Sequence, residues 1–140
     1  DGPLPPALVE EVKSQAARVD REIEDLDERQ AVITLTGGVL ARAGLLDESD
    51  ALLTAELKRS HSPYYYMSQL ASNAKKRGTP EGKAAAVDWS RRAYDSAQGT
   101  ATRLRWGGSY LNTLLELTPQ DAVAVEKAAM QVLGSNRGEG

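Results

Sequence analysis

The chain has 140 residues, enough for one domain with a modest core, and its 17 basic and 20 acidic residues give a formal net charge of −3. That balance does not indicate a nucleic-acid surface, so a binding role must come from local patches. Cysteine is absent, which excludes disulfides and thiol chemistry within these residues, and no apolar run approaches the roughly 18 residues of a membrane span.

The composition favours an all-α fold. Alanine and leucine, which are strong helix formers, supply most of the apolar side chains, and phenylalanine is absent. Runs of β-branched and aromatic residues between turn signals, the usual mark of strands, are missing. The chain begins at Asp1 rather than Met, so we expect it to be a piece of a longer protein.

An extended lead-in over residues 1–5 precedes a long N-terminal helix predicted over residues 6–29, since proline is tolerated in a first helical turn. Apolar residues recur along this helix at steps of three and four, which places them on one face. They are Leu8, Val12, Ala16, Val19, Ile23 and Leu26. Acidic residues crowd the end of the helix, where we expect a solvated surface rather than a metal site, because their spacing fits no calcium loop.

From Gln30 onward the sequence repeats with a period of 34 residues, which is typical of stacked helix pairs. The units are predicted over residues 30–63, 64–100 and 101–133, followed by a flexible tail over 134–140. Gly44 and Gly78 fall at the turns inside the first two units, where a left-handed residue is wanted. The third unit has Thr118 and Pro119 at its turn, and its last helix is predicted from Pro119 to about Leu133.

The eighth position of each unit must be small, because the two helices of a pair cross there. Gly37, Ala71 and Gly108 meet this requirement. The predicted fold is therefore a short right-handed solenoid of antiparallel helix pairs, with the long N-terminal helix as a cap. This pattern resembles the tetratricopeptide repeat, although the Trp and Tyr expected at positions 4 and 11 of that family are absent.

Two stretches carry a second likeness: GLLDESDALL over residues 44–53 with SHSPYY over 60–65, and AAVDWSRRAY over residues 85–94 with ATRLRWG over 101–107. They are similar to the helical C-terminal region of bacterial exported proteins of the thioredoxin family that resemble protein disulfide isomerase. The resemblance implies a thioredoxin fold before Asp1 and a periplasmic or exported location. None of that domain's catalytic residues can be assigned here, because its Cys pair is not in this chain.

The tetratricopeptide likeness also implies that the first helix of each unit lines a concave groove. On the present register the groove residues are Thr34, Arg42, Tyr65, Ser68, Ser72, Lys75, Lys76, Thr102, Arg105, Ser109 and Asn112. This set is basic and rich in hydroxyl groups. It suits an acidic segment or a chain-terminal carboxylate, which charge-assisted hydrogen bonds would hold.

No catalytic or cofactor site is predicted. The single histidine, His61, lies between two units with no second histidine and no nucleophile turn, so a surface position is expected. Phosphate-loop and dinucleotide motifs are missing, and no metal site is predicted. Large aromatic residues are expected mostly in the core: Trp89, Tyr94, Trp106 and Tyr110.

Two functional hypotheses follow, and neither makes the chain an enzyme. The first is an interaction module that binds a protein or peptide, acidic ones included, in the groove. The second is a structural or dimerising domain that supports an adjacent thioredoxin-like domain.

Overall fold

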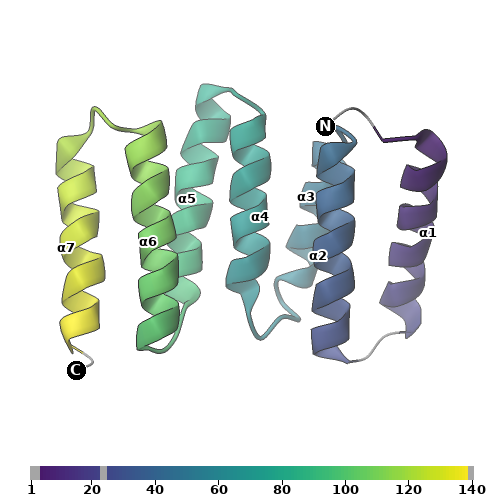
Figure 1. Cartoon of the computed structure of the whole chain (residues 1–140), viewed down its shortest axis with the longest axis horizontal. Helices are drawn as coiled ribbons and strands as arrows, with labels where there is room; N and C mark the ends of the chain where they lie inside the picture. Colours follow the sequence, from purple (N-terminus) through teal and green to yellow (C-terminus); the bar gives the residue numbers. More distant parts are fainter. Residues whose placement is uncertain (1–3, 23–24, 139–140) are drawn as a thin grey trace.

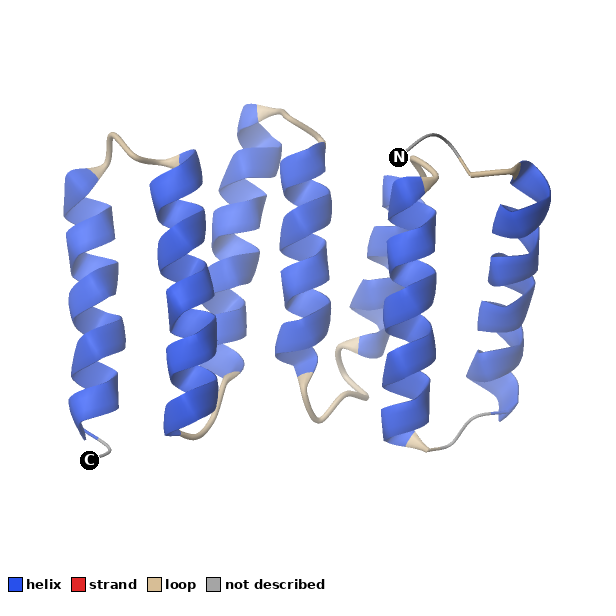
Figure 2. Cartoon of the chain, viewed as in Figure 1, coloured by secondary structure: helices blue, strands red, loops and turns tan. Residues whose placement is uncertain are grey.

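A computed structural model of the chain describes residues 4–22 and 25–138, and every regular element within them is a helix (Figures 1 and 2). The prediction of an all-α fold is confirmed. The helices are α1 (Pro6–Glu22), α2 (Leu26–Arg42), α3 (Leu46–Glu56), α4 (Pro63–Lys76), α5 (Pro80–Ser96), α6 (Thr100–Leu117) and α7 (Ala122–Gly138). Figure 1 shows them in a row from α1 to α7, with α3 and α5 behind α2, α4 and α6.

The predicted single helix over residues 6–29 is wrong, because α1 ends at Glu22 and α2 begins at Leu26. Asp25 has an extended backbone, and its carboxylate accepts hydrogen bonds from the backbone N–H groups of Asp27 and Glu28. A side chain that satisfies these otherwise unpaired donors marks the start of a helix. Part of the acidic run is thus a helix cap.

The predicted apolar stripe of the first helix is corrected at its beginning. Val9 is buried, whereas Leu8 is 46% exposed. Val12 is partly buried, and the other four side chains of the stripe lie outside the described residues. At the start of α1 the buried position is therefore Val9, one residue after the predicted Leu8.

Both predicted turn glycines are confirmed, since Gly44 and Gly78 have φ values of 83° and 68°. The last helix differs from the prediction at both ends. It begins at Ala122, where Asp121 accepts a hydrogen bond from the N–H of Ala124, rather than at Pro119. It also continues to Gly138, so the residues predicted as a flexible tail over 134–140 are helical as far as they are described.

The core has two linked parts. The first contains Ile33, Leu53, Tyr66 and Leu70, and the second contains Met67, Ala93, Tyr94, Ala97, Trp106 and Val132. Leu57 and Trp89 pack against both parts. The expected burial of the aromatic residues is confirmed for Tyr94 and Trp106, while Trp89 and Tyr110 are half-buried.

A buried ion pair joins the first turn of α2 to the end of α3. Arg29 donates from Nε to Oε2 of Glu56 at 2.8 Å and from Nη2 to Oε1, and both side chains are at most 6% exposed. Tyr66 of α4 lies close by, fully buried. Burial, reinforced by the Glu56 carboxylate, raises the pKa of Tyr66 to about 12.

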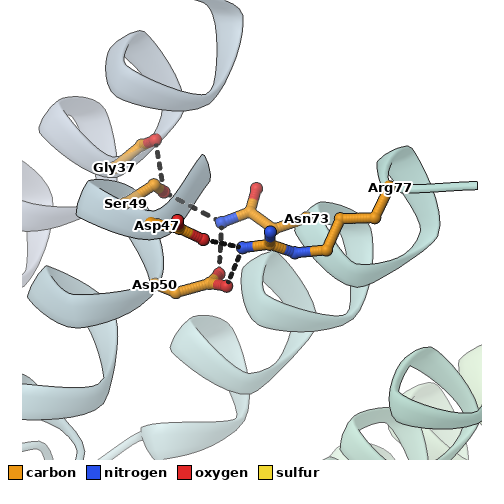
Figure 3. A network of polar contacts seen from close by, with 6 residues as sticks. All are labelled: Gly37, Asp47, Ser49, Asp50, Asn73 and Arg77. Atoms are coloured by element: carbon orange, nitrogen blue, oxygen red, sulfur yellow. Dashed lines mark hydrogen bonds and ion pairs between the residues drawn. The ribbon is translucent and has the colours of Figure 1, made fainter. Parts of the chain in front are cut away.

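A polar network fixes the other end of the α2–α3 pair to α4 (Figure 3). The buried amide of Asn73 donates to Ser49 Oγ at 2.9 Å and to Asp50 Oδ1 at 3.0 Å, and the Ser49 hydroxyl donates to the carbonyl of Gly37 at 2.8 Å. Arg77 bridges Asp47 and Asp50 at 2.9 and 2.7 Å. These hydrogen bonds raise the pKa of the Arg77 guanidinium.

Replacing Glu56 with Gln is expected to destabilise the protein by about 3 kcal/mol, because the buried guanidinium of Arg29 would lose the negative charge of Glu56. Urea unfolding followed by circular dichroism measures the free energy of unfolding. Replacing both partners, Arg29→Met with Glu56→Leu, should cost less than the single change. A single variant as stable as the parent would show that the pair is not buried.

The close contact between α6 and α7 occurs at Gly107 rather than at the predicted Gly108. A Cβ atom added at Gly107 would lie 2.6 Å from Val132 Cγ1 and 3.3 Å from Tyr94 Cδ1. A Cβ atom added at Gly108 would meet no heavy atom within 4 Å. On α6 the position that must be small is therefore Gly107, one residue earlier than predicted.

These adjacent glycines provide a matched pair of variants. Gly107→Ala should lower the free energy of unfolding by about 1–3 kcal/mol through overpacking against Val132. Gly108→Ala should raise it by up to about 1 kcal/mol, because alanine is the better helix former. Thermal and urea unfolding of both proteins measures the two effects, and equal stabilities would contradict this helix contact.

Candidate binding groove between α4 and α6

Two helices present matching rows of polar side chains toward a common space. On α4 the row contains Tyr65, Ser68, Ser72 and Lys75, spaced by three or four residues so that they share one face. On α6 it contains Arg105, Ser109, Thr113 and Glu116, spaced by three or four residues in the same way. The first members of the two rows are in contact, and so are the last members. We call the space between the rows the α4–α6 groove.

One end of the groove is formed by an arginine on aromatic rings. The guanidinium carbon of Arg105 lies 5.5 Å from the centre of the Tyr65 ring and 5.0 Å from that of Trp106. The rings of Tyr65 and Trp106 meet edge to face at 5.5 Å, and Tyr64 packs on both. Trp106 is buried while Tyr65 is exposed, so this cluster anchors Arg105 at the surface.

The other end is crossed by an ion pair. The Nζ atom of Lys75 lies 2.5 Å from Oε1 of Glu116, and the two side chains are about half exposed. The groove was predicted to be basic, but at this end the charge of Lys75 is neutralised by Glu116, which was not among the predicted groove residues.

Between these two ends lies a cavity of about 160 Å³. Its lining is dominated by small residues and hydroxyl groups: Ser68, Ala71, Ser72, Lys75, Ala86, Ser90, Ser109, Thr113 and Glu116. Ser90 and Thr113 are hydrogen-bonded to each other at 3.1 Å. The hydroxyls of Ser90 on α5 and Thr113 on α6 thus form a fixed polar part of the cavity lining.

The structure brings together six of the predicted groove residues. Ser68, Ser72, Lys75 and Ser109 line the cavity, and Tyr65 and Arg105 form its aromatic end. Arg42, Lys76 and Asn112 are exposed and are not among the residues that line it, and Thr34 and Thr102 are not either. Thr34 instead contributes its carbonyl, which accepts a hydrogen bond from Gln69 at 2.9 Å between α2 and α4.

Sequence reasoning missed Ser90, Thr113 and Glu116. Thr113 and Glu116 continue the Arg105–Ser109 row at helical spacing, so extending that row by one and two turns would have found them. Ser90 belongs to the second helix of its unit and gives no such signal.

The groove helices are basic within an acidic chain. Together α4 and α6 carry Lys75, Lys76, Arg103 and Arg105 against Glu116 alone. Arg103 stacks on Tyr94 and donates a hydrogen bond to the carbonyl of Ala97, so its guanidinium stabilises the fold. Arg105 contacts aromatic groups and has no ion pair with any described residue, which leaves its guanidinium available to an incoming carboxylate.

Outside the groove, the described residues offer few candidates for a metal site or a catalytic site. Among the described residues, no three His, Asp or Glu side chains gather as a metal site requires. His61 is exposed, as expected. Within the same part of the chain, no helix combines the length and the apolar character needed to cross a membrane.

No family model, no curated protein and no solved structure matches the chain.

Glu116→Gln should change the free energy of unfolding by no more than about 0.5 kcal/mol, because half-exposed ion pairs contribute little to stability. The same substitution at the buried Glu56 serves as the comparison in the urea experiment. A large loss at Glu116 would mean that the pair supports the fold rather than borders an open groove.

Proposed function

We propose that this domain is a non-catalytic interaction module that binds a protein segment in the α4–α6 groove. The observation that carries the proposal is a hydroxyl-lined cavity bordered by an exposed arginine held on two aromatic rings. Tyrosine, tryptophan and arginine are the residues most often responsible for binding energy in protein interfaces.

The dimensions suit a short peptide segment. The α4 row runs from Tyr65 to Lys75, which are ten residue steps, or about 15 Å, apart along the helix. An extended chain advances about 3.3 Å per residue, so four or five residues would span the groove. The serine and threonine hydroxyls can both donate to and accept from the peptide groups of such a segment.

The expected partner carries an acidic group. A guanidinium presents its donors in a fork that matches a carboxylate, and stacking on aromatic rings orients that fork before binding. Arg105 has these properties. We infer a preference for segments with Asp, Glu or a terminal carboxylate at the Arg105 end.

The order of the helices also fits a proposal for how they stack. Three helix pairs, α2–α3, α4–α5 and α6–α7, follow the N-terminal helix in the row of Figure 1. We propose that they form a right-handed, tetratricopeptide-like solenoid with α2, α4 and α6 on the concave side. The domain would then belong to an exported protein of the thioredoxin family, as the sequence likeness implies.

A second candidate function is a structural or dimerising role beside such a thioredoxin-like domain. The observation that favours it is the outer face of α7, where Val123 and Met130 are 78% and 67% exposed. Apolar residues grouped in this way commonly mark a contact surface.

Peptide display tests the groove directly. Peptides selected on the immobilised domain should be enriched in acidic residues, and their dissociation constants can be measured by fluorescence polarisation. Ser72→Trp would fill the groove and Arg105→Glu would repel the acidic group, so each should weaken binding by at least about tenfold.

The control is Lys58→Glu, which makes the same charge change as Arg105→Glu at an exposed residue between α3 and α4. It should leave the dissociation constants within about twofold of the parent, beyond the modest effect of surface charge. Circular dichroism must show that all three variants keep their helicity. Peptides that bind every variant equally well, or a selection without enrichment, would rule out the groove.

A further inference from the structure

The last helix leaves one face uncovered at the end of the row (Figure 1). Its inner face is buried through Ala128 and Val132, which pack toward α6. Val123 and Met130 lie on the opposite face, one heptad apart, and a shallow hollow of about 870 Å³ extends over them. Helix α7 therefore presents two large apolar side chains to solvent on one face, two turns apart.

Opposite charges flank this apolar face. Glu126 and Lys127 lie halfway between Val123 and Met130, and because successive helical residues are about 100° apart, they border the face on its two sides. Both side chains are exposed and form no ion pair with any described residue. The face thus has an acidic edge and a basic edge at the same height.

The charge pattern is complementary to itself in one orientation. When two copies of a helix pair in parallel about a two-fold axis, each edge of one helix meets the opposite edge of the other. Glu126 of each copy would then face Lys127 of its partner, twice in the interface. In an antiparallel pair, equal edges would meet, and glutamate would face glutamate.

We propose that the exposed face of α7 binds the same face of a second copy of this chain, in parallel. Val123 would pack on Val123 and Met130 on Met130 of the other copy, with an ion pair on each side. A single helix face is small beside a standard interface of roughly 1,600 Å², so the dimer should be concentration-dependent. This inference is independent of the groove, which lies on the other side of α6.

A charge swap tests self-association by analytical ultracentrifugation. Glu126→Lys alone and Lys127→Glu alone each place like charges at both edges, so each should weaken the dimer by at least about tenfold. The double variant, Glu126→Lys with Lys127→Glu, restores opposite charges and should return the dissociation constant to within about threefold of the parent. If the face bound a different protein instead, the double variant would not recover the binding that each single variant loses.

Cysteine cross-linking tests the orientation, since the chain has no cysteine of its own. Val123→Cys and Met130→Cys should each form a disulfide-linked dimer alone under mild oxidation, because parallel pairing sets each residue against itself. Leu35→Cys, at an equally exposed position on α2, should not. Cross-linking only when the first two variants are mixed would indicate antiparallel pairing and overturn the proposal, as would a parent protein that stays monomeric up to about 1 mM.

Discussion

The buried ion pair between Arg29 and Glu56 is the contact on which the N-terminal half of the structure depends. It holds the start of α2 against the end of α3, the shortest helix, which has few residues with which to pack. The network around Asn73 closes the opposite end of the same pair against α4. Buried charges tolerate few geometries, so these polar contacts add to the apolar cluster around Ile33 and Leu53 in fixing this half. The C-terminal half instead uses aromatic side chains and the close approach at Gly107.

The helical character of the chain and two of its turns could be predicted from the sequence, because helices and glycine turns leave local signals. Gly44 and Gly78 mark their turns by the left-handed backbone that only glycine adopts easily. The break between α1 and α2 was missed because Asp25 was interpreted as one more charge in an acidic run. The choice between Gly107 and Gly108 depends on where Val132 lies, and no local pattern contains that information.

The groove was predicted only in part for a related reason. Each row of polar residues follows helical spacing and is visible within its own helix. The contacts between rows join Tyr65 to Arg105 and Lys75 to Glu116, about forty residues apart. The relative height of α4 and α6, which decides these contacts, is set by how both pack on α5. The predicted set also includes three residues of the same polar or basic types that do not reach the cavity, namely Arg42, Lys76 and Asn112.

Helix α5 contributes Ala86 and Ser90 to the lining of that cavity, where they are buried one helical turn apart. Neither side chain belongs to the rows on α4 and α6, yet their sizes determine how deep a ligand can enter. If the groove binds a peptide as proposed, exchanging these two residues would change the fit of the peptide while leaving the polar rows on α4 and α6 unchanged. The selectivity of such binding would then depend on α5, and its affinity on the polar rows of α4 and α6, so that each could change separately.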